Sequence, residues 1–244
     1  KSAMGANSEI HPLEWHATVI QCIALHFREM EYWSEAILYH DKAIEFVIEN
    51  NTHHWGSTLR NYYTDRAITK EMSGDWVAGV KDRILSFNSS QSNSRNITNE
   101  VEESFRELKT SVDLALATKT SYAIAIYDDS HHPHLKYEDC LEILDLWREC
   151  LTEVLYTYGP EYLDSLQNYL ISLSEKSYYE TYKEPMPYLV ADRMTLLSEI
   201  DYIKCNIDIN ENRLNDFIQD FTKLWDNLKS FDKADDCRML RFNI

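Results

Sequence analysis

Residues 211–228 read ENRLNDFIQDFTKLWDNL and contain the most informative helical pattern in the chain. Large apolar side chains recur there at intervals of three or four residues: Leu214, Phe217, Ile218, Phe221, Leu224, Trp225 and Leu228. The other face carries carboxylates at Asp216, Asp220 and Asp226. The pattern predicts a helix that lies across a core with one wide apolar face and leaves a polar face for solvent or a ligand.

The rest of the chain has the composition of a helical protein. Its 244 residues include only five glycines and five prolines, so the residues that interrupt helices are scarce. No segment shows the alternation of apolar and polar residues that is typical of a half-buried strand. The predicted fold is therefore all-α, an antiparallel bundle of eight or nine helices with short connections.

Helix starts and breaks can be placed along the first half of the chain. We expect a first helix over residues 11–30, a second after Ser34, whose hydroxyl can cap it, and a third over residues 57–87. Gly74 lies inside the third, where glycine costs ~1 kcal/mol relative to alanine. A kink is therefore expected near Gly74.

The predicted domain organisation is simple. Residues 88–96 (NSSQSNSRN) contain too few apolar side chains to pack and are predicted to form a polar loop. Gly159 and Pro160 form a helix stop followed directly by a helix start. We predict one helical domain over residues 11–229, between a flexible N-terminus at 1–10 and a C-terminal tail at 230–244.

Charge and apolar content limit the classes of partner. The formal net charge is −17 and the isoelectric point is near 4.9, and no long run of Lys and Arg offers a local exception. Such a surface repels phosphate backbones and anionic lipids, so neither nucleic acid nor a membrane is expected as a partner. No apolar run reaches the roughly 18 residues of a membrane span, and the first residues lack a signal-peptide core. Together with five scattered cysteines, these features predict a cytoplasmic protein with reduced thiols.

Catalytic and metal-binding patterns are weak. His131, His132 and His134, with Asp128 and Asp129, could hold a divalent metal, but no further ligand spacing completes the site, and a polar loop is the simpler interpretation. The five glycines form no phosphate-binding loop, and no nucleophile motif occurs. We therefore expect no enzyme activity and no cofactor, while a metal-dependent helical enzyme centred on these histidines stays an alternative.

Four segments have distinctive patterns of apolar and acidic residues: Leu163–Glu175 (LDSLQNYLISLSE), Val101–Leu116 (VEESFRELKTSVDLAL), Gln219–Trp225 (QDFTKLW) and Glu31–Ala43. Together they resemble segments of the 14-3-3 family of phosphopeptide-binding adaptors. The resemblance implies a cup-shaped all-α fold whose amphipathic groove binds phosphoserine or phosphothreonine peptides of partner proteins. It also implies a homodimer through the first two helices, with Trp15, Val19 and Ile37 as candidate buried groups.

The resemblance assigns roles to individual residues. It places Asn168, with Glu175 as its acidic neighbour, on the peptide backbone, and it implies an apolar wall that contains Ile171, Leu214, Phe217, Leu224 and Trp225. For the phosphate it offers Arg66, with Lys70 one turn later as a substitute for a missing arginine. The Arg-Tyr pair that completes the family's phosphate site is replaced here by Ala123 and Ile124, so the expected phosphate clamp is degraded.

A helical scaffold that binds unphosphorylated peptides is the alternative. Ala24, Tyr32, Ala36 and Ala43 are spaced somewhat like one tetratricopeptide-type helical hairpin. No period near 34 residues recurs later in the sequence. The two hypotheses differ in whether the first helical hairpin is repeated along the chain.

Overall fold

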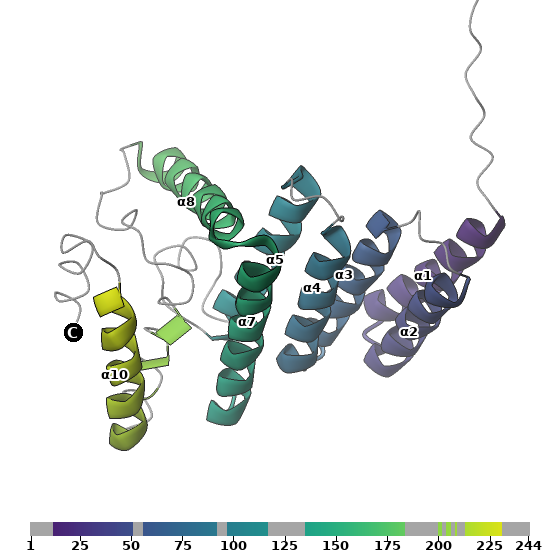
Figure 1. Ribbon diagram of the computed structural model, residues 1–244. Coiled ribbons are helices and arrows are strands. Elements are labelled where there is room, and N and C mark those ends of the chain that lie inside the picture. Colours follow the sequence, from purple (N-terminus) through teal and green to yellow (C-terminus); the bar gives the residue numbers. More distant parts are fainter. Residues whose placement is uncertain are drawn as a thin grey trace, which may run out of the picture. The chain divides into compact units, whose positions relative to one another are not determined.

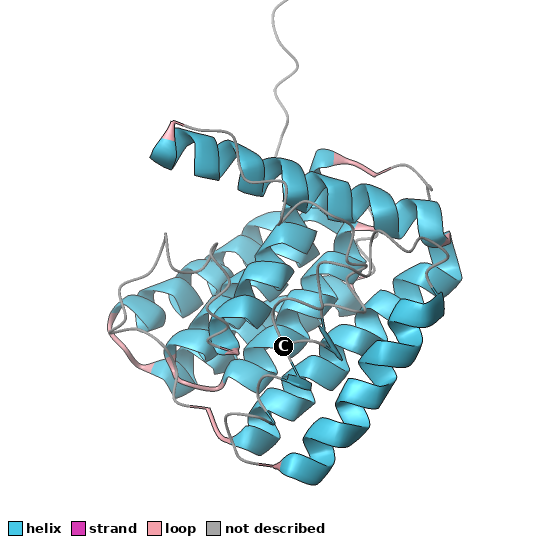
Figure 2. Ribbon diagram, turned by 90° about the vertical axis from the view of Figure 1, so that its left-hand side faces the viewer, coloured by secondary structure: helices cyan, strands magenta, loops and turns pink. Residues whose placement is uncertain are grey.

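The structure, a computed structural model, describes residues 12–50, 56–91, 97–116, 135–183, 200, 201, 204, 205, 208 and 213–230. In this part of the chain eight helices can be delimited and no strand occurs (Figure 1, Figure 2). The predicted all-α class is confirmed. The chain divides into two compact units, Lys1–Ser92 and Asn93–Ile244, and the boundary falls inside the predicted polar loop.

The first unit consists of two helical hairpins. Helix α1 (Pro12–Glu29) pairs with α2 (Trp33–Glu49), and α3 (Gly56–Met72) pairs with α4 (Trp76–Ser90) (Figure 1). The third helix predicted over residues 57–87 is thus two helices, and the expected kink at Gly74 is a full break.

Local geometry explains the break between α3 and α4. Gly74 has φ +93°, which few other residues adopt, and the Asp75 carboxylate accepts a hydrogen bond from the Ala78 N–H to cap α4. Helix α4 continues to Ser90, three residues beyond the predicted end, where the hydroxyl of Ser90 donates to the Phe87 carbonyl. The polar stretch 88–96 therefore begins as helix.

The second hairpin repeats the first at an offset of 43 residues. Trp33 and Trp76 begin the second helix of their hairpins, and Glu31 and Gly74, both at positive φ, precede them by two residues. Small buried residues recur at the same offset: Ala24 and Ala67, Ala36 and Gly79, Ala43 and Ser86. The offset is longer than the period of about 34 residues expected for a tetratricopeptide repeat, and it lies in the range of about 40–47 known for other helical repeats.

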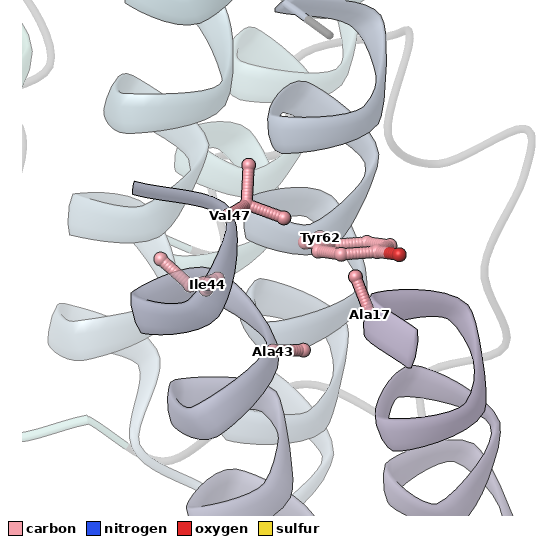
Figure 3. Packing of buried hydrophobic residues seen from close by; sticks show 5 residues of the cluster. All are labelled: Ala17, Ala43, Ile44, Val47 and Tyr62. Carbon is pink, nitrogen blue, oxygen red and sulfur yellow. The ribbon is translucent and has the colours of Figure 1, made fainter. Parts of the chain in front are cut away.

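Helix α3 packs against both helices of the first hairpin. The ring of Tyr62, only 6% exposed, lies against a cluster of apolar side chains on α1 and α2 (Figure 3): Ala17, Ala43, Ile44 and Val47. Small residues in this cluster let the helices approach closely, and the aromatic ring fills the space between them. This contact joins the two hairpins.

The second unit contains α5 (Asn99–Ala115), α7 (Tyr137–Tyr158), α8 (Pro160–Tyr182) and α10 (Leu214–Ser230). Thr98 caps α5 by accepting from the Val101 N–H. Gly159, at φ +91°, separates α7 from α8, which confirms the helix boundary predicted at the Gly-Pro pair.

The core of the second unit lies among α5, α7 and α8. The rings of Phe105 on α5 and Trp147 on α7 are 5.4 Å apart between centroids and are almost completely buried. Cys150 and Cys205 are also buried, and burial raises the pKa of their thiols to about 12 and about 11. Such thiols stay protonated near neutral pH and are poor nucleophiles.

Some predicted features lie outside the described residues. These are the N-terminus at 1–10, the histidine-containing stretch 131–134, the residues Ala123 and Ile124, and the tail at 231–244. The predictions made for them therefore stay predictions.

Candidate protein-binding surface

Helix α10 has the amphipathic pattern predicted from its sequence, but its apolar face is only partly covered. Leu224 is buried in the second unit, while Leu214 is 67% exposed and Trp225 is 37% exposed. Ile218, one turn after Leu214, is also exposed. The wide apolar face is thus divided: one edge anchors the helix and the other faces solvent.

The exposed edge forms a continuous surface that we call the α10 ladder: Leu214, Phe217, Ile218, Phe221 and Trp225. Its three aromatic rings adjoin one another in sequence: Phe217 and Phe221 are tilted, with centroids 5.7 Å apart, and Phe221 and Trp225 are stacked, with centroids 6.3 Å apart. From Leu214 to Trp225 the ladder extends over about 16 Å of helix. Adjoining rings hold one another in place, so the ladder offers a partner a partly ordered apolar surface.

Carboxylates occupy other parts of α10. Asp226 is exposed and Asp216 is partly exposed, with an ion pair of 2.8 Å between Asp216 and Arg213. Asp220 is buried and lies 3.4 Å from the ammonium of Lys204 and 3.7 Å from that of Lys223. The helix therefore combines an apolar strip with carboxylates that lie mainly on its other face.

A buried polar cluster holds the N-terminal end of α10. The hydroxyl of Tyr137 donates to the Asp208 carboxylate at 2.5 Å, and the Arg213 guanidinium lies over the Tyr137 ring at 4.1 Å. Asp208 is completely buried, and burial raises its pKa above the usual value. Burial, followed by the hydrogen bond to Asp208, also raises the pKa of Tyr137. These contacts join α7 to the segment just before α10.

Arg66 and Lys70, the residues expected to bind phosphate, lie together in the first unit. The Arg66 guanidinium binds Asp82 of α4 through Nε (2.8 Å) and Nη2 (2.7 Å), and it binds Asp41 of α2 through Nη1 (2.5 Å). The Lys70 ammonium lies 2.8 Å from Oδ2 of Asp82, the oxygen that also accepts from Nε of Arg66. Both cations are thus paired with carboxylates that come from neighbouring helices.

The other predicted site residues belong to the second unit. Asn168 is exposed on α8 and Ile171 is partly buried on the same helix, whereas the side chain of Glu175 lies outside the described residues. On α10, Leu214, Phe217 and Trp225 form part of the ladder, and Leu224 anchors the helix instead. The predicted set is therefore divided between the two units, and its assembly into one site stays a prediction.

Ile218 and Phe221 complete the α10 ladder and belong to the apolar face predicted from the sequence, but they were not among the predicted peptide-binding residues. Their helical spacing from Leu214 was a sufficient signal to include them. A second feature was not expected from the sequence. In the first unit, a hydrogen-bonded chain joins Gln21, His40 and Thr69. His40 follows Ala36 at helical spacing on the buried side of α2, so a polar residue at a core position was the available signal.

Searches among protein-family models, curated proteins and solved structures returned no match for this chain. Among the described residues, no group of three or more metal-binding side chains comes together. Within the same residues, no helix combines the length and the apolar character needed to span a membrane.

Proposed function

We propose that this chain is a helical scaffold that binds an unphosphorylated, amphipathic segment of a partner protein on the α10 ladder. It acts by binding and not by catalysis. The observation that carries the proposal is the exposure of Leu214, Ile218 and Trp225 along one line of a helix whose opposite edge is anchored. The recurrence of the helical hairpin in the first unit supports the scaffold class over a single-groove adaptor.

The energy available on the α10 ladder fits a reversible complex. Covering the exposed parts of Leu214, Ile218 and Trp225 contributes about 3–5 kcal/mol at the usual value for buried apolar area. The partner's own apolar side chains contribute a similar amount, and ordering of the partner offsets part of the sum. An affinity in the micromolar range is therefore expected.

Charge defines the partner further. The helix that carries the ladder also carries Asp216, Asp220 and Asp226, and the whole chain has a net charge of −17. A segment with apolar residues on one face and Lys or Arg beside them complements this surface, whereas an acidic segment is repelled. We therefore propose a basic amphipathic helix as the ligand.

Phosphopeptide binding, implied by the resemblance, stays a prediction. A phosphate at Arg66 and Lys70 has to compete with Asp82 and Asp41, which already accept from these cations at 2.5–2.8 Å. It also has to approach a strongly negative chain. These two contributions favour the unphosphorylated ligand.

A homodimer and a cytoplasmic location also stay predictions. Trp15 and Val19 are exposed and Ile37 is partly exposed, so these side chains are accessible to a second copy. Sedimentation of the purified protein at micromolar concentration tests for the dimer.

The proposed function can be tested with a labelled model peptide of leucine and lysine that forms a basic amphipathic helix. Fluorescence polarisation should give a micromolar Kd, and replacing Leu214 and Ile218 together by serine should weaken binding about tenfold or more. The control is Leu38→Ser, a leucine on α2 that is 50% exposed, and this change should leave the Kd unchanged.

Charge attraction alone has a different signature. If the serine variant of the ladder binds the peptide as well as the parent protein does, the peptide is held by net charge and the proposal is wrong. Both the ladder variant and the Leu38→Ser control retain the net charge of −17, so the comparison isolates the apolar contribution.

A further inference from the structure

A second apolar surface lies on α1, the first helix of the repeated hairpins. We call it the α1 stripe, and it consists of exposed residues along one face: Trp15, Val19, Cys22, Ile23, His26 and Met30. The large apolar side chains among them are between 38% and 59% exposed. No acidic or basic residue other than the histidine occurs in the stripe, although the chain as a whole is highly charged.

The 43-residue repeat identifies the counterpart of this stripe on α3. Val19 corresponds to Tyr62, and Ile23 corresponds to Arg66. Tyr62 is the residue that packs against the apolar cluster of α1 and α2, and Arg66 is the residue that binds Asp41 of α2. The α1 stripe is therefore equivalent to the face by which α3 stacks on the preceding hairpin.

Two further pairs extend the equivalence. Cys22 corresponds to Asp65, whose carboxylate accepts from Gln21 of α1 at 2.8 Å. His26 corresponds to Thr69, whose hydroxyl lies 3.0 Å from Nε2 of His40 on α2. Four α3 residues that contact the first hairpin thus have exposed counterparts on α1: Tyr62, Asp65, Arg66 and Thr69.

We propose that the α1 stripe is a stacking surface for a helical hairpin of a partner protein. That hairpin packs on α1 in the way that the hairpin of α1 and α2 packs on α3. In stacked repeats, a face that nothing covers is ordinarily polar. The exposed face of α1 instead carries Trp15, Val19 and Ile23, as a face that is covered by another element would.

The equivalence also defines the chemistry of the partner. Arg66 on α3 requires a carboxylate opposite it and finds Asp41, but its counterpart on α1 is Ile23. A carboxylate opposite Ile23 would be buried without a cation, which is costly. The partner hairpin should therefore present small and branched apolar side chains, as α2 does with Ala43 and Val47, and no acidic residue at that position.

A second copy of the chain fits this surface less well. The face of α1 and α2 that stacks on a following helix is already covered by α3 in each copy, since Tyr62 lies against it. A copy would also bring a further net charge of −17. These points favour a partner of different sequence.

The proposal can be tested in one chain by duplicating the first hairpin. A copy of residues 12–54 is inserted directly before Pro12, which preserves the offset of 43 residues. In the added copy Asp41 is replaced by leucine and Cys22 by serine. The original Cys22 then serves as the reporter, because it is exposed in the parent chain and becomes covered if the added hairpin stacks.

Alkylation of the original Cys22 by N-ethylmaleimide, measured by peptide mass spectrometry, should slow about tenfold or more in the duplicated chain. An unchanged rate contradicts the proposal, whether the added hairpin is unfolded or folds without stacking. Replacing Val19 and Ile23 of the original hairpin by glutamine should restore fast alkylation, whereas Leu38→Gln, the matched control, should not.

Sedimentation of the parent protein is a second test of the proposal. A dimer that is disrupted by Val19→Gln would show that a second copy occupies the stripe, and it would overturn the assignment to a different hairpin. A monomer at micromolar concentration agrees with the proposal.

Discussion

Glu31 and Gly74 occupy the same position in successive hairpins, 43 residues apart, and both have positive φ, 61° and 93°. Each lies in the short connection between two antiparallel helices. The two positions share a backbone conformation with positive φ, but one carries a glutamate side chain and the other is glycine. A residue with a Cβ is strained in this conformation, and glycine is not.

The first prediction concerns this pair. Glu31→Gly should stabilise the first unit by about 0.5–1 kcal/mol, because it relieves backbone strain at an exposed position. Gly74→Glu should destabilise it by about 1 kcal/mol, although a Cβ at Gly74 meets nothing within 4 Å. Urea unfolding of both variants measures the change in the free energy of unfolding. Changes of the same sign and size in the two variants would contradict the explanation by backbone strain.

The second prediction concerns pH. His40 is completely buried, and its ring joins Gln21 to Thr69 through contacts of 3.0 Å on each side. Because the Gln21 carbonyl can only accept, Nδ1 donates to it. The Thr69 hydroxyl, which lies beside Nε2, donates to the Asp65 carbonyl at 2.9 Å. Burial, followed by the nearby charges of Arg28 and Arg66, lowers the pKa of His40 from 6.5 to about 4.

A lowered histidine pKa has a definite consequence for stability. Between pH 6.5 and about 4 the unfolded chain binds a proton that the folded chain does not, so stability is present above this window and is lost as the pH falls through it. The loss amounts to about 3 kcal/mol. Hydrogen exchange of α2 and α3 amides should accelerate on acidification in the parent more than in His40→Gln, and equal acceleration would contradict the prediction.

The third prediction compares the two carboxylates that bind Arg66. The Asp82 side chain is 3% exposed and pairs with both Arg66 and Lys70, whereas that of Asp41 is 42% exposed. Asp82→Asn should destabilise the first unit by about 3 kcal/mol, because it leaves two cations without their buried partner. Asp41→Asn should cost less than about 1 kcal/mol. Similar losses in urea unfolding would show that burial does not decide the strength of these pairs.

The fourth prediction concerns Gly79, where α4 approaches α3. A Cβ at this position would lie 2.6 Å from Cγ of Glu71, which is held by an ion pair of 3.0 Å to Arg83. Gly79→Ala should therefore destabilise the protein by about 1 kcal/mol, despite the higher helix propensity of alanine. In a Glu71→Ala background the same change should be neutral or stabilising. Thermal unfolding of the two single variants and the double variant measures the coupling free energy between these positions. A coupling free energy of zero would contradict the predicted clash between the Cβ and Glu71.

The sequence predicted the helical class and most helix boundaries because these depend on local features. The break at Gly74 and the boundary at Gly159 and Pro160 both follow from backbone preferences of single residues. The apolar spacing of α10 also predicted its amphipathic pattern, in which Leu224 is buried. It did not predict which part of the apolar face is covered, because that depends on neighbouring helices.

The hairpin repeat was missed for a physical reason. Its equivalent buried positions differ in residue type, since Ala36 corresponds to Gly79 and Val47 corresponds to the buried Ser90. The ion pairs of Arg66 could not be predicted from the sequence either, since Asp41 and Asp82 come from two other helices. Only the packed structure brings these three residues together.

The most direct test of the account compares one basic amphipathic peptide, which contains a serine, with its phosphoserine form. We predict that the unphosphorylated peptide binds at least as tightly as the phosphorylated one, and that replacing Leu214 and Ile218 by serine weakens both. Fluorescence polarisation supplies the two values of Kd. Tighter binding of the phosphorylated peptide, lost in Arg66→Glu and Asn168→Ala, would contradict the account and establish a phosphate clamp instead.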